Sequence, residues 1–396
     1  MEVDPLTGLE VARCGLYVHF PYCLRRCPYC DFTIAIARSV PGARYADAVL
    51  AELRMRLADR PEWAARPLDS IYLGGGTPSL WEPHDVGRVL EGIAAALPLA
   101  RDAEISLEAN PEVADTARLA GYRTAGVNRL SLGIQSFDAG VLTTLGRSHS
   151  PADAEAAFRA ARVAGFGNVS VDLIHGVPGQ SLDQAVEDAH RTVALGPDHV
   201  SSYVLTVERE HLGSETVFSR RLRQGRLALP DDALVVEMVD AVGAVLAGAG
   251  LVRYEISSHG LPGRHSRHNA LYWTGGESLA LGAGAVGFHR RDAGGVRTTN
   301  IRSTPRWLET VESGRRPDEE TEALDRAALY AERLLLGLRL RSGLDLATLW
   351  ADHGLAPRAA ELATLIRDGF VERVDGRVRL TRKGAHLHQE VSARLV

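Results

Sequence analysis

Residues 17–32 read YVHFPYCLRRCPYCDF, and this stretch indicates both a fold and a chemistry. Cys23, Cys27 and Cys30 follow an apolar run at 15–20 that is typical of a buried strand. Their C-x3-C-x2-C spacing places three thiols on one short loop, and cysteine thiolates hold iron–sulfur clusters. A structural zinc site needs four closed ligands. The spacing therefore favours three corners of a [4Fe–4S] cluster, and a three-ligand zinc ion or a chance grouping is the alternative.

The fourth cysteine, Cys14, is not expected on the cluster. A strand rises about 3.3 Å per residue, so the strand at 15–20 carries Cys14 more than about 15 Å from the loop. We expect Cys14 to be a small buried apolar side chain. One iron of the cluster is then left without a cysteine. That iron could chelate the amino and carboxylate groups of S-adenosylmethionine (SAM) and deliver one electron to its sulfonium.

Strand-like runs alternate with amphipathic segments through the first half of the chain. The strands are expected at 15–20, 69–73, 103–108, 128–134, 168–174 and 199–205, and helices at 45–59, 84–97, 151–165 and 182–195. Such alternation predicts a parallel sheet with right-handed crossovers. The fold class is therefore α/β, an incomplete (β/α)6 TIM-like barrel whose chemistry collects at the C-terminal strand ends.

Polar or glycine-rich residues follow the predicted strands at that end. Gly74-Gly75-Gly76-Thr77-Pro78 follows the second strand, Glu108 ends the third, Gln135 ends the fourth and Asp172 lies on the fifth. Each alone is explained equally well by a turn, a helix cap or a surface carboxylate. Their recurrence at one end of consecutive strands favours a ligand site.

The pattern changes beyond residue 225. A helix is expected at 231–249 and a strand at 252–257, followed by RHSRHNALYW at 264–273, which is either a ligand-binding motif or a surface loop whose Tyr and Trp side chains pack. The tail from about 320 is helical, with a hairpin signal at Asp375-Gly376. The expected domains are the barrel at 1–225, an α/β extension at 226–320, and a winged-helix-like module at 321–396.

Composition narrows the class of protein further. The chain has 396 residues, a formal net charge of −5 and 45% hydrophobic residues. Nucleic-acid binding is not expected, because non-specific affinity for it comes from basic charge. Lys383 is the only lysine, which excludes a Schiff-base or Walker lysine elsewhere. No window is apolar enough to span a membrane and the N-terminus has no signal-peptide pattern, so a soluble, cytoplasmic protein is expected.

The motifs together resemble a known family, the radical SAM proteins of the HemN/HemW group. The resemblance covers about residues 13–390. The motifs that carry it are YVHFPYCLRRCPYCDF, GGGTPSL, LEANPE, LSLGIQSF, LGRSHS, VDLIHGVPGQ, HVSSYVLTVE, YEIS, RHNALYW and LLLGLRLRSGLDL.

Three branches of that group compete. The oxygen-independent coproporphyrinogen III dehydrogenases carry an N-terminal extension and a fourth cysteine two residues after the third, where this chain has Phe32. That branch, with its decarboxylation, is disfavoured. The haem chaperone branch, HemW, resembles the chain better in length and in His268-Asn269-Ala270-Leu271-Tyr272-Trp273, so we expect a haem chaperone with an acceptor protein. HemN-like methyltransferases or cyclopropanases of small molecules are the alternative, and productive SAM cleavage is left open.

The resemblance also implies site residues. SAM is expected to meet Tyr17 at its adenine, Gly75, Gly76 and Thr77 at its methionine part, and Glu108, Gln135, Arg147 and Asp172 through polar contacts, with Arg147 holding the methionine carboxylate.

A haem site is implied as well. His268 is the expected axial ligand of haem, with Arg264 and Arg267 near the propionates. Departures from the HemW pattern are Val286 in place of a histidine, an insertion at 209–215, and Ser258-His259 after YEIS.

Overall fold

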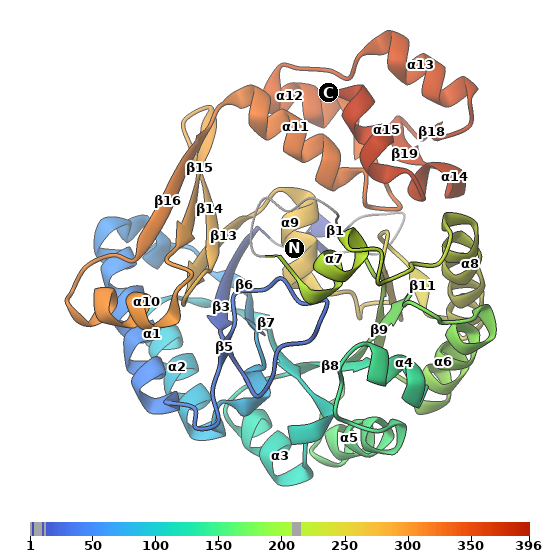
Figure 1. The fold of residues 1–396 in the computed structure, drawn as a ribbon. Helices are drawn as coiled ribbons and strands as arrows, with labels where there is room; N and C mark the ends of the chain where they lie inside the picture. The colour runs from blue at the N-terminus through green and yellow to red at the C-terminus, as the bar shows by residue number, and fades with distance from the viewer. Residues whose placement is uncertain (1, 4–9, 12, 208–214) are drawn as a thin grey trace.

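A curled, mixed sheet of twelve strands forms the centre of the molecule (Figure 1). The computed structural model describes residues 2–3, 10–11, 13–207 and 215–396. The strand order is β11-β12-β10-β9-β8-β7-β6-β3-β13-β14-β15-β16. The central strands are β3 (Cys14–Phe20), β6 (Leu68–Gly75), β7 (Leu99–Ala109), β8 (Arg129–Gln135), β9 (Val169–His175) and β10 (His199–Val204).

These central strands are parallel neighbours in chain order. Most of their residues are buried. In β3 and in β8, every residue except one is buried. Parallel strands covered on both faces carry such near-continuous apolar runs. The six predicted strands and the incomplete barrel are therefore confirmed, with ends that differ by a few residues.

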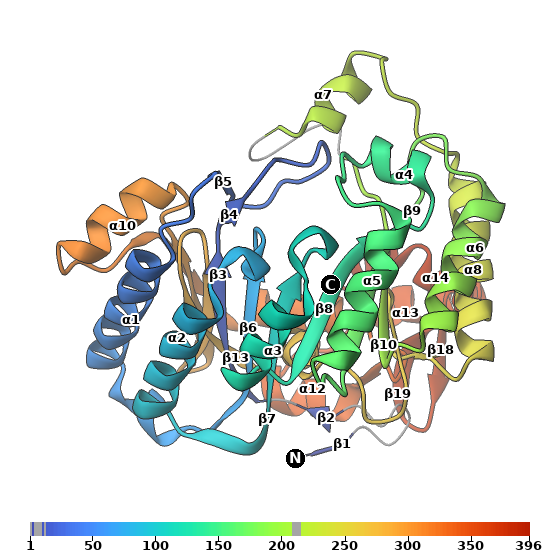
Figure 2. The same cartoon turned by 90° about the horizontal axis from the view of Figure 1, so that it is seen from below.

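Helices cover the outer face of the sheet (Figure 2). The predicted helices are confirmed, and Ser150 and Ser181 begin two of them as capping boxes. The helices up to residue 312 are α1 (Gly42–Asp59), α2 (Pro83–Ala96), α3 (Thr116–Thr124), α4 (Ala139–Thr144), α5 (Pro151–Val163), α6 (Leu182–Leu195), α7 (Val217–Arg223), α8 (Asp232–Gly248), α9 (Arg267–Thr274) and α10 (Thr304–Glu312).

The stretch predicted as an α/β extension adds strands to both edges of the barrel sheet. On one side β13 (Glu277–Leu281) pairs in parallel with β3, followed by the antiparallel β14 (Val286–Arg291), β15 (Gly294–Asn300) and β16 (Asp318–Leu324). On the other side lie β12 (Ser258–Gly260) and β11 (Val252–Arg253).

The strand predicted at 252–257 is therefore shorter than expected. The chain turns after Arg253, whose guanidinium donates to the carbonyls of Glu255 at 3.1 Å and Ile256 at 2.6 Å. Those bonds hold a turn in place of extended backbone.

The C-terminal residues pack around an apolar cluster of their own, which includes Leu334, Leu365 and Val378. The hairpin predicted at Asp375-Gly376 is confirmed, and both residues have positive φ. The elements are α11 (Arg326–Gly337), β17 (Leu344–Asp345), α12 (Leu346–His353), α13 (Ala359–Arg367), β18 (Val371–Val374), β19 (Arg377–Leu380), α14 (Arg382–Ala385) and α15 (His388–Leu395). The three domain boundaries stay a prediction.

Short elements complete the described chain. Two strand pairs are β1 (Glu2–Val3) with β2 (Glu10–Val11), and β4 (Tyr22–Cys23) with β5 (Ala35–Ile36). The insertion predicted at 209–215 lies, except for Glu215, outside the described residues. In the described ranges, no helix combines the length and the hydropathy needed to cross a bilayer.

Candidate functional site

A cavity of about 470 Å³ opens at the C-terminal ends of the central strands. We call it the barrel cavity. All the residues predicted for the cluster and for SAM line it, except Tyr17: Cys23, Cys27, Cys30, Gly75, Gly76, Thr77, Glu108, Gln135, Arg147 and Asp172. Residues more than 140 positions apart are thus brought to one space because their strands end at the same edge of the sheet.

The three-cysteine loop covers the mouth of this cavity. Cys23 ends β4 and is buried, while Cys27 and Cys30 are half-buried and joined by a backbone bond of 3.2 Å from the Cys30 nitrogen to the Cys27 carbonyl. Helix α7 supports the loop, since the Phe218 backbone nitrogen donates to the Pro28 carbonyl at 2.9 Å. Figure 2 shows β4, β5 and α7 on the same side of the sheet.

The donor set of this loop fits an iron–sulfur cluster. Thr77 Oγ1 donates to Cys23 Sγ at 3.4 Å and Arg147 Nη1 lies 3.9 Å from Cys27 Sγ, and hydrogen bonds to sulfur tune such clusters. In the described parts of the chain, no three His, Cys, Asp or Glu side chains converge on the position of a single metal ion. A cubane does not require that convergence, because each thiolate binds a different iron.

Cys14 lies away from this loop. It is the first residue of β3, is buried, and stands about 20 Å from the far end of its strand. Burial raises the pKa of its thiol to about 12. This placement agrees with the expectation of a small apolar side chain.

The glycine-rich segment joins the cavity to the cluster loop through its backbone. Gly76 N donates to the Phe20 carbonyl at 2.7 Å and Thr77 N to the Tyr22 carbonyl at 2.9 Å. A Cβ on Gly76 would stand 2.7 Å from the Pro21 carbonyl oxygen. A side chain at position 76 would therefore separate the segment from the loop.

Two buried carboxylates face the cavity. Glu108 accepts from the Tyr72 hydroxyl at 2.8 Å and from the Gly75 nitrogen at 3.0 Å, and burial raises its pKa to about 7. Both oxygens of Asp172 lie 3.0 Å from the Ser131 hydroxyl, and burial raises the pKa of Asp172 as well. The oxygens of both carboxyl groups can accept hydrogen bonds from ligand hydroxyl groups.

Gln135 and Arg147 lie near the cluster side of the cavity. Gln135 ends β8 with φ of 71°, an uncommon conformation for a residue other than glycine. Arg147 Nη2 donates to Asn110 Oδ1 at 2.7 Å and to the Gly133 carbonyl at 3.0 Å. These bonds place a fixed positive charge next to the three-cysteine loop.

Tyr17 lines a second cavity of about 470 Å³, which shares Asp31, Phe32, Gly75 and Glu108 with the first. Its hydroxyl pairs with His19 Nδ1 at 3.0 Å. The predicted contact of Tyr17 with adenine is therefore not at the wall of the barrel cavity. We call this space the second cavity; its apolar side chains include Phe32, Val286, Phe288 and Leu336.

The surroundings of His268 differ from those expected. Most of the motif lies on helix α9, and His268 is 1% exposed. Its Nδ1 pairs with Ser70 Oγ at 2.9 Å and its Nε2 with the Tyr272 hydroxyl at 3.0 Å. The surface-loop alternative is wrong, because residues 267–274 are a helix, and neither ring nitrogen of His268 is free to bind haem iron, because both are hydrogen-bonded inside the barrel. Arg267 instead pairs with Asp102, and Arg264 lies 3.7 Å from Asp198.

The prediction from sequence missed Arg129, Ser131 and Asn269, which also line the barrel cavity. A signal for two of them was present. Side chains alternate along a strand, so counting back from Gln135 by twos places Gly133, Ser131 and Arg129 on the same face. For Asn269 no signal existed, since its exposure to the cavity depends on where α9 packs.

A loop of three cysteines over a partial parallel barrel, with polar residues at its strand ends, defines the radical SAM class. A model for the Radical SAM superfamily matches residues 17–192, and a model for the HemN C-terminal domain matches 324–387. The solved structure of coproporphyrinogen III oxidase (HemN) from Escherichia coli has a TM-score of 0.80, at 23% identity, and covers 97% of this chain and 90% of that one.

Similarity in sequence narrows the class further. The heme chaperone HemW of Mycobacterium tuberculosis is 39% identical, over 99% of this chain and 97% of the relative. HemW of Bacillus subtilis is 32% identical, over 95% and 97%. The chain belongs to the radical SAM superfamily and, within it, to the HemW family. Membership implies a [4Fe–4S] cluster and SAM as cofactors.

Proposed function

We propose that this chain is a haem chaperone, which binds haem and passes it to an acceptor protein in the cytoplasm. The observation that carries the proposal is its similarity, along almost its whole length, to proteins named heme chaperone HemW. Phe32, which is 60% exposed beside the three-cysteine loop, adds support, since the coproporphyrinogen branch is expected to have a cysteine there.

Cys23, Cys27 and Cys30 would hold the [4Fe–4S] cluster, and the barrel cavity would hold SAM. When bound, the cluster supplies a single electron to SAM. The residues of the chain bind and orient: Arg147 pairs with the methionine carboxylate, and Glu108 and Asp172 accept hydrogen bonds from ribose hydroxyls. The proposed SAM site leaves out Tyr17, since Tyr17 does not line that cavity.

The SAM site is tested by equilibrium binding of SAM to the reconstituted protein. Arg147→Ala is expected to weaken SAM binding at least about tenfold, because it removes a charge-assisted hydrogen bond. Arg159→Ala is the matched control, since Arg159 is exposed and pairs with Glu155 on the outer surface. Equal affinity in the Arg147 variant and the control would contradict the assignment.

The second cavity is the space that we propose for haem. Phe32, Val286, Phe288 and Leu336 provide apolar surface for a porphyrin ring, and the cavity adjoins the cluster loop through Asp31. His268 takes no part in this proposal, because both nitrogens of its ring are hydrogen-bonded, one to Ser70 and one to Tyr272.

Haem titration of the reconstituted protein tests the function. A chaperone saturates at about one haem per chain and loses the haem to an apo-acceptor. Because both ring nitrogens of His268 are hydrogen-bonded, His268 offers no ligand to haem iron. This favours a second candidate function, a radical methyltransferase or cyclopropanase of a small molecule. No saturable binding at micromolar haem, together with substrate-dependent release of 5′-deoxyadenosine, would favour that candidate.

A further inference from the structure

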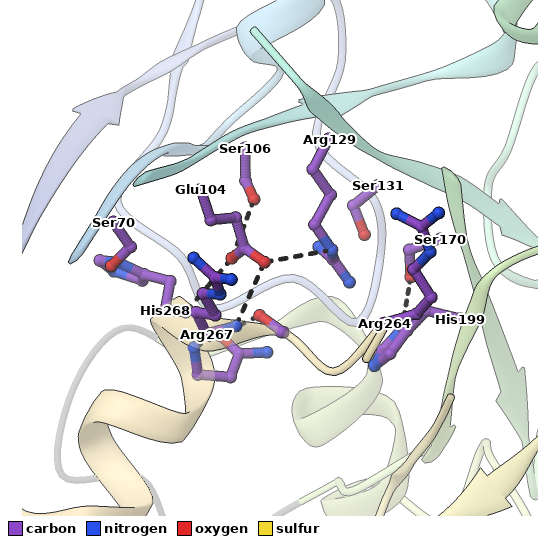
Figure 3. Close-up of polar contacts among 12 residues, drawn as sticks. Ser70, Glu104, Ser106, Arg129, Ser131, Ser170, His199, Arg264, Arg267 and His268 are labelled. Carbon is purple, nitrogen blue, oxygen red and sulfur yellow. Dashed lines mark hydrogen bonds and ion pairs between the residues drawn. The ribbon is translucent and has the colours of Figure 1, made fainter. Parts of the chain in front are cut away.

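A buried arginine stands at the floor of the barrel cavity. Arg129 is the first residue of β8 and is 2% exposed, yet its side chain lines the cavity. Figure 3 shows Arg129 beside Glu104. Gln135, at the opposite end of the same strand, lies about 20 Å away along the strand. Arg129 is thus far from the cluster loop and separate from the proposed SAM contacts of Arg147.

The guanidinium of Arg129 has an ion-pair partner, Glu104, and no hydrogen-bond partner among the described residues. Its Nε lies 3.8 Å from Glu104 Oε2, beyond hydrogen-bond distance, and has no hydrogen-bond partner. The guanidinium makes no hydrogen bond to any residue in the described ranges. Arginine stays charged in proteins, and buried polar groups are normally hydrogen-bonded. Arg129 therefore has donors available to a ligand.

Glu104 does not satisfy this arginine, because it is bonded elsewhere. Its oxygens accept from the backbone nitrogens of Arg267 and His268, both at 3.2 Å, and from Ser106 Oγ at 3.3 Å (Figure 3). Glu104 thus holds the first turn of α9. Asp172, a further carboxylate that lines the cavity, accepts a hydrogen bond from the Ser131 hydroxyl.

A second donor comes from α9. Asn269 lines the barrel cavity with Arg129, and its side-chain amide has no hydrogen bond to a described residue. The helix that carries it is fixed, since His268 bonds Ser70 on β6 and the Ser266 hydroxyl accepts from the Asn269 nitrogen at 3.3 Å. The Asn269 amide on α9 and the Arg129 guanidinium on β8 are thus held at the same cavity by rigid elements.

We propose that Arg129 and Asn269 form a carboxylate subsite, which takes one propionate arm of the porphyrin. The identity of this ligand rests on the proposed function. A carboxylate only accepts hydrogen bonds, and the planar guanidinium offers it two parallel donors. A single guanidinium, which already has Glu104 at 3.8 Å, matches the one negative charge of a carboxylate better than the two charges of a phosphate. Gly75 and Glu108 line both cavities, so the two cavities are adjacent, and the proposal takes one arm of a ligand in the second cavity to enter the first.

The experiment compares haem with its dimethyl ester, in which both propionates are uncharged. Wild-type protein is expected to bind haem about tenfold or more tightly than the ester. Arg129→Gln and Asn269→Ala should reduce that preference by weakening haem and leaving the ester unchanged. Asn269→Ala keeps the Arg129–Glu104 pair, so the test stands if Arg129→Gln fails to fold. Arg159→Gln is the matched control, an exposed arginine that lines neither cavity.

A second measurement separates the subsite from the function. Sodium propionate at tens of millimolar should raise the unfolding midpoint of the wild type and of Arg159→Gln, and not that of Arg129→Gln or Asn269→Ala. Haem binding with an unchanged preference in both cavity variants overturns the subsite and leaves the haem chaperone in place. No haem binding, with propionate stabilisation that depends on Arg129, overturns the proposed function and keeps the subsite. Absence of both effects overturns both.

Discussion

Thr77 Oγ1 donates a hydrogen bond to Cys23 Sγ over 3.4 Å, and this bond joins the glycine-rich segment to the cluster loop. Cys23 is the buried member of the three cysteines. A hydroxyl donor at a cluster sulfur stabilises the more negative, reduced state of the cluster. The sequence element that follows β6 therefore acts on the redox chemistry as well as on the shape of the cavity.

Thr77→Val is expected to lower the reduction potential of the reconstituted cluster. The substitution removes the hydroxyl and keeps the branched shape, so cluster content should stay unchanged. Redox titration followed by electron paramagnetic resonance measures the shift. Thr143→Val, on the exposed surface of α4, is the control and should have the wild-type potential. The hypothesis is wrong if both variants titrate together.

Cys27→Ser is expected to abolish the cluster, while Cys14→Ala keeps it. Anaerobic reconstitution should give about four iron per chain in wild type and in Cys14→Ala, because Cys14 is buried at the far end of β3. Iron analysis and the visible absorption spectrum are the measurements. Loss of the cluster from Cys14→Ala alone would reverse the assignment of ligands.

Glu108 should make stability depend on pH. Burial raises its pKa from 4.5 to about 7. The folded state thus holds the proton more tightly than the unfolded state, and the contribution is full below pH 4.5 and is lost as pH rises to about 7. The difference is about 3 kcal/mol. Asp172 adds to it in the same direction, since burial raises its pKa too.

Glu108→Gln should flatten the profile between pH 4.5 and 7 and be more stable than wild type at pH 8. Denaturant unfolding at each pH measures this. Glu155→Gln is the control, because Arg191 lowers the pKa of the exposed Glu155 and the sign is reversed. Parallel profiles for wild type and Glu108→Gln would show that the carboxylate ionises in the folded state as it does in the unfolded chain.

His268 is expected to contribute to stability and not to haem binding. His268→Ala removes a packed ring and two hydrogen bonds, and should lower the free energy of unfolding by about 3 kcal/mol. Tyr272→Phe removes one of these bonds and should cost about 1 kcal/mol. Haem spectra of both variants, taken under conditions where they are folded, should match wild type. A haem spectrum that changes in His268→Ala alone would support His268 as the axial ligand of haem.

Local sequence patterns were sufficient to predict the strands of the barrel. Apolar runs bounded by glycine, proline and caps predicted β3 and β6 to β10, because each run is buried on both faces. The cysteine spacing predicted the cluster loop, and the rule that chemistry collects at the C-terminal strand ends grouped Gly75, Glu108 and Asp172 correctly. The strand predicted at 252–257 is too long, because the Arg253 side chain stabilises a turn through hydrogen bonds. A pattern of apolar residues carries no information on such side-chain bonds.

The sequence by itself determined which side chains share a strand face and which thiols share a loop, since both depend on near neighbours along the chain. Only the tertiary structure decided what the motif at 268–273 does. Packing of α9 against β3 and β6 brings His268 into a hydrogen bond with Ser70 and places Asn269 at the wall of the cavity that Arg129 also lines. The physical reason is that a ligand needs an unpaired donor or acceptor, and pairing depends on contacts between segments far apart in the chain.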